Sequence, residues 1–211
     1  MAGEVIDVSI TAGAGTPVWP GTPALKTTRR LAIERGDDAN ATLLTMDVHC
    51  GTHVDAPLHF IDGGADLESV GLDPFVGQAF VAHVGAVRRI GADELDACDI
   101  PPETERLLLR TSSSGGWADR PFDPDFPALT LDGARWVADR GLLLVGIDYV
   151  SIQRFDEGPE VHRALLGAGV CILEGTDLAD VDQGPYDLVC LPVRLAGVEA
   201  APARVILRRR R

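Results

Sequence analysis

"LLLVGIDYVSIQRFDEGPEVHRALLGAGVCILE", residues 142–174, is the stretch of this 211-residue chain that decides its fold class. It opens with the apolar run "LLLVGID" and closes with "VCILE", and both runs have the length and the bounding residues of strands. Between them, Pro159 suits the first turn of a helix, and Gly167 or Gly169 suits its end. The stretch predicts strand, helix, strand, and with this order a protein of mixed α and β structure.

The rest of the chain is predicted to be rich in strands. Short β-branched or leucine-rich runs that indicate strands lie at 5–10, 43–48, 79–87, 106–111, 187–193 and 203–207. A second helix is indicated by "TLDGARWVADRG", with Thr130 as its N-cap and Gly141 at its end. The first half has long loops, which are often functional. Without a repeat or a flexible linker in the sequence, we expect one domain over residues 1–211.

The composition indicates a globular protein and argues against two classes of partner. The apolar fraction of 45% and the charged fraction of 24% are near globular averages. A net charge of -13 argues against nucleic acid, whose phosphates bind clustered Lys and Arg. The arginines at 208–211 are the exception, and a solvated tail is favoured there over a partner-binding arm.

The sequence also predicts a cytoplasmic location. No stretch has the ~20 apolar residues that a spanning helix needs. The start, "MAGEVIDVSI", lacks the basic and apolar regions of an export signal. Four scattered cysteines without C-x-x-C spacing are expected to be reduced thiols.

"HCGTHVDAPLHF", residues 49–60, gathers four polar side chains that suit a metal: His49, His53, Asp55 and His59. A helix is excluded because Gly51 and Pro57 are poor interior residues. A straight strand is excluded because His49 and His59 would lie ~33 Å apart, at ~3.3 Å per residue. A strand that bends at Gly51 and again near Pro57 brings His49, His53 and Asp55 around one point.

Two imidazoles and a carboxylate suit Zn²⁺ or Mn²⁺, and a small set of protein ligands leaves positions open for water and substrate. We therefore predict a catalytic metal site, the alternative being a polar, hydrogen-bonded turn. Cys50 points away from its neighbours in an extended chain and is expected to pack in the core. His83 lies in an apolar strand pattern and is expected to be an ordinary structural histidine.

At these residues the sequence resembles the metal-dependent cyclase family, which includes the bacterial kynurenine formamidases and isatin hydrolases. The family pattern H-x-G-T-H-x-D-x-P-x-H is matched at every specified position of residues 49–59. The resemblance continues through "TPVWPGTP" (16–23) and through most of residues 161–207. It implies an α/β fold of the swivelling β/β/α type, in which a β-rich, barrel-like mixed sheet is flanked by a few helices.

The resemblance also implies the metal ligands and one or two ions, Zn or Mn, per chain. His49, His53 and Asp55 would bind a first metal. His162 and Glu174 match the later ligand positions, and Asp55 and Glu174 would bridge to a second ion. Taken alone, His162 is equally an exposed helix residue and Glu174 a solvated strand end.

Further roles follow from the same resemblance. His59 would be the general acid and base that moves a proton between water and the leaving nitrogen. Trp19 would pack against the substrate, although it could equally hold its Pro-rich loop against the body. Asp148 and Ser151 follow a strand and are candidates for contact with the substrate or for support of the ligands.

The leading functional prediction is a metal-dependent hydrolase of a non-peptide amide bond, in an aryl formamide or a small cyclic amide. The alternative is a metal-dependent cyclase or dehydratase, and a third possibility is a small-molecule or metal-binding protein without activity. The segment "RFDEGPEVH" (154–162) differs from formamidases of N-formylkynurenine, which leaves the substrate open. The family implies a homo-oligomer, a dimer or a tetramer, that acts on a small molecule.

Overall fold

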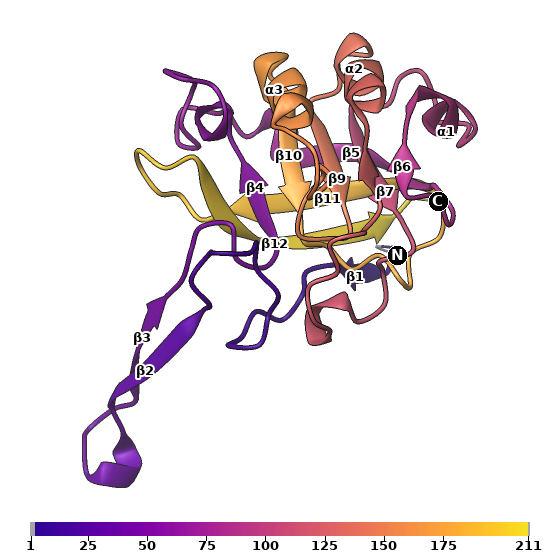
Figure 1. The fold of residues 1–211 in the computed structure, drawn as a ribbon. Coiled ribbons are helices and arrows are strands. Elements are labelled where there is room, and N and C mark those ends of the chain that lie inside the picture. Colours follow the sequence, from indigo (N-terminus) through magenta and orange to yellow (C-terminus); the bar gives the residue numbers. More distant parts are fainter. Residues whose placement is uncertain (1–2, 211) are drawn as a thin grey trace.

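A barrel-like sheet lies at the centre of the computed structural model, which describes residues 3–210 (Figure 1). The strands are β1 (Val5–Asp7), β2 (Lys26–Leu31), β3 (Ala41–Thr45), β4 (His53–Asp55), β5 (Val76–His83), β6 (Arg89–Ile90), β7 (Arg106–Arg110), β8 (Ala128–Leu129), β9 (Leu144–Ile147), β10 (Cys171–Glu174), β11 (Gly184–Pro192) and β12 (Ala200–Arg209). The helices are α1 (Ala92–Asp96), α2 (Leu131–Asp139) and α3 (Glu160–Gly167), and 3-10 turns lie at Ile33–Arg35, Pro57–His59, Asp73–Phe75 and Trp117–Asp119.

The strand order closes the main sheet into a ring. It runs β12-β11-β5-β7-β9-β10-β4, and β4 pairs again with β12. The pairs from β5 through β7 and β9 to β10 are parallel, and the other pairs of the ring are antiparallel. β1 pairs with the far end of β12. The predicted α/β fold with a barrel-like mixed sheet and few helices is confirmed.

The helices cover one side of this sheet, so the parallel strands are buried on both faces (Figure 1). In β7, Leu108 belongs to the cluster inside the barrel, whereas Leu107 and Leu109 belong to the cluster shared with α2 and α3. Burial on both faces explains why these strands are continuous apolar runs in the sequence rather than alternating ones.

The predicted strand-helix-strand unit is β9, α3 and β10, with β9 and β10 parallel and in register. Pro159 is the N-cap of α3, and Gly169, with a φ of +79°, lies just after its end. The second predicted helix is α2, whose N-cap Thr130 accepts a hydrogen bond from the amide of Gly133. Gly141 follows it with a φ of +67°. Both helical signals are confirmed.

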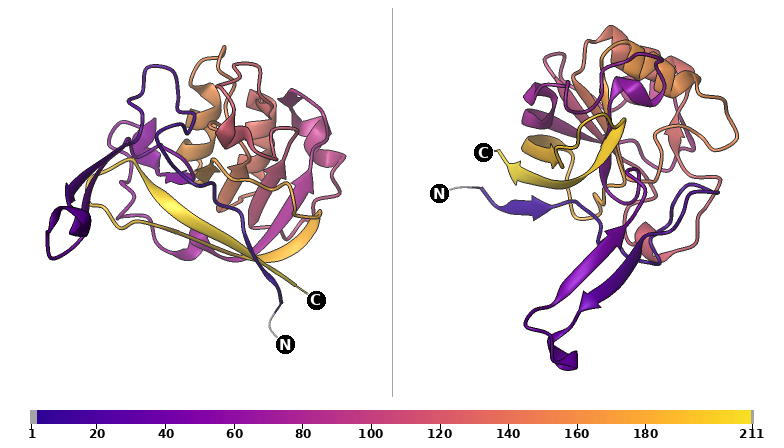
Figure 2. Two further views of the ribbon diagram at one scale, coloured as in Figure 1. Left: turned by 90° about the horizontal axis from the view of Figure 1, so that it is seen from below. Right: turned by 90° about the vertical axis from the view of Figure 1, so that its left-hand side faces the viewer.

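The prediction of a strand over 43–48 was wrong in its bounds. The strand is β3, which ends at Thr45 and pairs only with β2 among the described residues. Together β2 and β3 form a hairpin, here called the arm, which projects from the barrel in all three views (Figures 1 and 2). Leu43 and Leu44 face opposite sides of β3 and are 51% and 52% exposed, so neither face is covered.

The arginines near the C-terminus are not a free tail. β12 extends through Arg209, and Arg208 and Arg209 form ion pairs with Asp187 (2.8 Å) and Asp182 (2.9 Å). They remain exposed, but the strand and these acidic partners order them. Arg211 lies outside the described residues. Within residues 3–210, no helix is both long and apolar enough to cross a membrane.

Gly175, directly after β10, is a tight crossing point between the two halves of the chain. Its φ is +74°, and a Cβ at this position would overlap the carbonyl oxygen of Gly51. Its own carbonyl accepts a hydrogen bond from the hydroxyl of Thr52 at 2.5 Å. The turn before β4 and the end of β10 are therefore packed backbone to backbone.

We expect Gly175→Ala to lower the free energy of unfolding more than Gly169→Ala does. Gly169 has the same left-handed φ but open space around it, so its substitution should cost only the conformational term of about 1–2 kcal/mol. The clash at Gly175 should add about 1–3 kcal/mol. Urea unfolding of both variants measures the difference, and equal losses would contradict this packing.

Candidate metal centre

The motif of residues 49–60 folds as two bends around the short strand β4. Gly51 has a φ of +80°, which turns the chain into β4. Ala56 is extended, with φ and ψ of -102° and 163°, and Pro57 then starts the 3-10 turn that carries His59. The predicted bends at Gly51 and Pro57 are confirmed. His49 lies in the turn before Gly51 rather than at a strand end.

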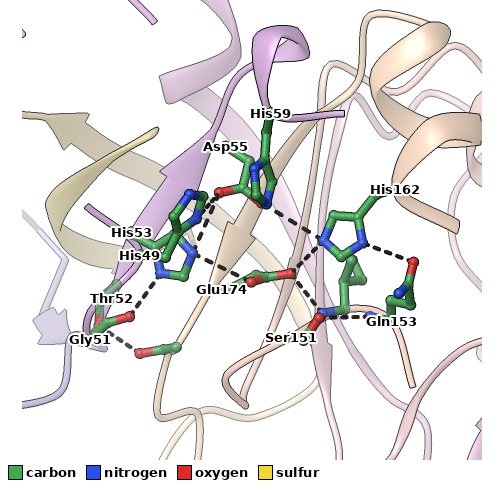
Figure 3. Close-up of polar contacts among 12 residues, drawn as sticks. His49, Gly51, Thr52, His53, Asp55, His59, Ser151, Gln153, His162 and Glu174 are labelled. Carbon is green, nitrogen blue, oxygen red and sulfur yellow. Dashed lines mark hydrogen bonds and ion pairs between the residues drawn. The ribbon is translucent and has the colours of Figure 1, made fainter. Parts of the chain in front are cut away.

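Strand pairing brings the second half of the chain to these residues. β10 pairs antiparallel with β4 and places Glu174 opposite His53. α3, which leads into β10, carries His162 above the same point (Figure 3). The fold thus gathers all six side chains named from the sequence as ligands or catalyst: His49, His53, Asp55, His59, His162 and Glu174.

Asp55 is the centre of this cluster. Its Oδ1 lies 3.0 Å from Nδ1 of His49 and 3.4 Å from Nε2 of His53, and its Oδ2 lies 3.8 Å from Nε2 of His162 and 4.0 Å from Nε2 of His59. Glu174 is the second carboxylate, with its two oxygens 3.4 Å from His53 Nε2 and 3.2 Å from His162 Nε2. Both carboxylates stand between pairs of imidazoles.

Several of the potential metal-binding atoms in this cluster lie close together but lack a hydrogen-bond partner. His53 Nε2 and both oxygens of Asp55 are fully buried, and none forms a hydrogen bond within residues 3–210. Buried polar atoms without partners are rare and costly in folded proteins. Two sets have ligand atoms within 4.8 Å of one another, His53 with Asp55 and Glu174, and His49 with Asp55 and His59. The residues therefore fit a divalent cation, and Asp55 belongs to both sets.

Hydrogen bonds fix two of the imidazole rings for this purpose. His53 Nδ1 donates to the carbonyl oxygen of Gly51 at 3.0 Å, and His162 Nδ1 donates to Oε1 of Gln153 at 3.0 Å. Because Nδ1 is engaged in each of these bonds, Nε2 is the ring atom left to bind a metal ion. An imidazole held in this way by a carbonyl or amide oxygen is the usual arrangement of a metal-binding histidine.

The carboxylates and the imidazoles of the cluster stabilise each other's charged forms. Burial disfavours the charged form of His53, but the carboxylates beside it outweigh burial and raise its pKa; the pKa of His49 is raised for the same reasons. Burial likewise opposes ionisation of Asp55 and Glu174, yet the neighbouring histidines lower both of their pKa values. For His59, burial prevails and lowers the pKa. The lowered pKa of His59 favours its neutral form.

A cavity of about 390 Å³ opens onto the cluster. Its wall includes His49, His59, His162 and Glu174, and also two of the residues expected to contact a substrate, Trp19 and Ser151. Trp19 packs against Phe155 at 5.1 Å between ring centroids, so it both closes its loop against the body and faces the cavity.

Asp148 has a different place from the one expected of a substrate contact. It is fully buried and is not among the residues that line the cavity. Its carboxylate accepts hydrogen bonds from the amide and hydroxyl of Thr111 and from the hydroxyl of Ser114. Asp148 therefore holds the start of the long loop after β7.

Several residues of the site carried no clear signal in the sequence. Gln153 orients His162, and Ser151 Oγ accepts the backbone N–H of Gln153 at 3.2 Å. Glu199, just before β12, lies 3.6 Å from His49 Nε2. The polar residues directly after β9 were a usable hint for Gln153. Nothing near Glu199 in the sequence connects it with His49.

We expect Gln153→Leu to weaken the binding of Zn²⁺ or Mn²⁺ by about 10- to 100-fold, because His162 loses the acceptor that orients it. Competition with a chelator of known affinity measures the constant. Gln153→Glu retains an oxygen acceptor and should restore most of the affinity. Gln183→Leu should leave the affinity unchanged, because the Gln183 side chain accepts the backbone N–H of His83, which lies outside the site. Unchanged affinity in Gln153→Leu would contradict this role.

The chain is similar in sequence to known families and proteins. A family model described as "Putative cyclase" matches residues 6–154. "Cyclase-like protein 3" of Arabidopsis thaliana is 36% identical over 214 residues, which cover 97% of this chain and 79% of the relative. "Kynurenine formamidase" of Erythrobacter litoralis is 33% identical over 211 residues, which cover 97% of this chain and 94% of the relative.

Solved structures share the fold. "The Structure Of Potential Metal-Dependent Hydrolase With Cyclase Activity" is 36% identical, covers all of both chains and superposes with a TM-score of 0.85. Isatin hydrolase A from Labrenzia aggregata, at 19% identity, has a TM-score of 0.79 and covers 97% of this chain and 93% of its own. At 19% identity, the similarity to this isatin hydrolase shows a shared fold only.

Proposed function

Since the chain belongs to the metal-dependent cyclase family and is an amidohydrolase of non-peptide C–N bonds, we propose that its substrate is an aryl formamide or a small cyclic amide. The ligands of the proposed divalent ion, zinc or manganese, are His49, His53, Asp55, His162 and Glu174. Asp55 belongs to two sets of converging atoms: the set with His53 and Glu174 suits one ion, and the set with His49 would hold a second ion only if His59 were also a ligand.

A single observation carries the proposal: buried, unpaired donor atoms lie beside the wall of an open cavity. A structural metal would be enclosed by its protein ligands, whereas here the cluster meets space for a substrate. A divalent ion bound there would supply Lewis-acid polarisation of a carbonyl and would lower the pKa of water. The remaining chemistry belongs to the side chains.

His59 is the proposed proton carrier. It lines the cavity, and its Nε2 lies 4.0 Å from Asp55, so it borders the cluster and the substrate space together. Its neutral imidazole takes a proton from the attacking water and returns it to the nitrogen of the leaving amine. A C–O bond forms as the C–N bond breaks, and the products are a carboxylic acid and an amine.

Aromatic side chains offer the substrate ring a place next to this chemistry. Phe60 stacks on His162 with ring centroids 4.4 Å apart, and Phe60 and Trp19 both line the cavity. Ser151, also in the wall, provides a hydroxyl for orientation. A planar aryl amide suits a cavity that combines these rings with polar side chains able to orient it.

We expect His59→Ala to lower kcat on formanilide by at least about 100-fold, the usual contribution of general acid and base catalysis, while the bound metal remains. Turnover and metal content are measured on the same preparation. His83→Ala removes a histidine that is hydrogen-bonded to Val181 outside the site and should leave both quantities unchanged. Loss of metal in His59→Ala would instead make His59 a ligand.

A cyclase or dehydratase reaction is the second candidate, because one relative and one solved structure carry the word cyclase in their names. Isotope incorporation separates the two reactions. Only hydrolysis places ¹⁸O from solvent water into the product acid. Activity that survives removal of all divalent metal would exclude both.

We also propose that a second copy of the chain covers the arm. An isolated two-stranded hairpin is marginally stable in water, and this one exposes apolar side chains on both faces. The base of the arm is continuous with the cavity, since Thr22 before it and Asp47 after it line the wall. A homo-oligomer, a dimer or a tetramer, explains how such an arm keeps its shape.

We expect the double variant Leu43→Asp, Leu44→Asp to lower the molar mass in solution toward that of a monomer, because buried charges would oppose association. Light scattering on size-exclusion fractions measures the mass. Leu72→Asp is the matched control, since Leu72 is 66% exposed but lies outside the arm. A monomeric wild type would refute the proposal directly.

The location proposed for the protein is the cytoplasm. Cys50, Cys98, Cys171 and Cys190 are all buried and free. Free thiols in a chain with four cysteines suit a reducing compartment, where disulfides are rare. Burial also supports the prediction that Cys50 packs in the core.

A further inference from the structure

Asp47 places a carboxylate in the wall of the cavity. It follows the arm and precedes His49, and its Oδ1 accepts the backbone N–H of His49 at 3.0 Å. Among residues 3–210, no Lys, Arg or His side chain forms an ion pair with Asp47 within 4.0 Å, and Asp47 belongs to neither set of converging ligand atoms. Asp47 thus brings a charge to the cavity that no described side chain neutralises.

The other acid of the wall outside the proposed metal centre is different. Glu157 forms an ion pair with Arg89 and lies 3.8 Å from Nε of Arg154. Arginine therefore already balances the charge of Glu157. Within the described part of the chain, no Lys or Arg lines the cavity, so of these two acids only Asp47 lacks an arginine partner.

From these contacts we propose that Asp47 selects, among aryl amides, those that carry a cationic amine away from the scissile bond, and that the cavity disfavours anionic substrates. The inference rests on the proposed amide hydrolysis and adds the charge of the substrate. Trp19 lines the same cavity, and an indole attracts an ammonium group over its face. A carboxylate at this place meets Asp47 and finds no Lys or Arg in the described wall.

This charge preference separates substrates that the proposed function alone treats as equal. A formylated aryl amine with an aminomethyl group gains an ion pair with Asp47. The same molecule with a carboxymethyl group gains none and is repelled. For one half-buried pair near the protein surface, the expected preference is about 5- to 10-fold in kcat/KM.

The test compares three formanilides that carry a meta aminomethyl, hydroxymethyl or carboxymethyl group, with protein loaded with Zn²⁺. We expect kcat/KM to fall in that order, and the preference for the cation over the neutral compound to shrink as salt is added. Asp47→Asn should bring the ratio of cationic to neutral substrate close to one. Asparagine keeps an oxygen that accepts the N–H of His49, so the turn is preserved.

Glu157→Gln is the matched control, because it also removes a carboxylate from the wall, but one that Arg89 already neutralises. It should change the ratio less than Asp47→Asn does. An equal change in the two variants, or a wild-type preference for the anionic compound, overturns the assignment to Asp47.

A binding measurement keeps this test separate from the test of the reaction. Calorimetry with the benzamides that bear the same three meta groups reports charge preference without turnover. If no formanilide is hydrolysed but the cationic benzamide binds tightest, and Asp47→Asn removes that advantage, the proposed reaction fails and the charge preference stands. If the three benzamides bind equally, or none binds, the charge preference is wrong.

Discussion

The antiparallel pairing of β4 with β10 on one edge and with β12 on the other is the constraint on which the rest of the structure depends. The same three residues, His53–Asp55, close the barrel and supply the centre of the metal cluster. Side chains alternate along a strand, so His53 and Asp55 face the site while Val54 packs inside the barrel. A register shift of one residue would place a carboxylate in the apolar core and a valine in the site.

This arrangement buries Asp55 completely and leaves Glu174 only 4% exposed. Burial of a carboxylate is costly unless opposite charge or hydrogen bonds offset it, and here imidazoles surround both groups. A cation would satisfy the atoms that the protein leaves unpaired. The unpaired atoms of the site therefore lower the stability of the fold locally. The apolar clusters on both sides of the sheet offset this cost.

Most side chains of the site could be predicted from the sequence, because they lie in short motifs made of residue types that bind metals. The bends at Gly51 and Pro57, the strand-helix-strand unit and the resemblance together named every side chain of the cluster. The arm could not be foreseen because "LLTMDV" predicts a strand but not its place, and exposure depends on tertiary partners that a sequence window does not contain. Gln153 and Asp47 were missed because ordinary polar residues in loops give no periodic signal.

Closure of the ring also sets when the site can exist. Asp55 belongs to the first third of the chain, whereas β10 and β12 lie near its end, so the contacts that complete the barrel have a large separation in sequence. Such topologies fold slowly, since distant segments must meet before their contacts stabilise anything. During synthesis the first histidines leave the ribosome long before their partners. The growing chain cannot bring Asp55 and Glu174 together until β10 has been made, and the barrel around them closes only when β12 pairs with β4.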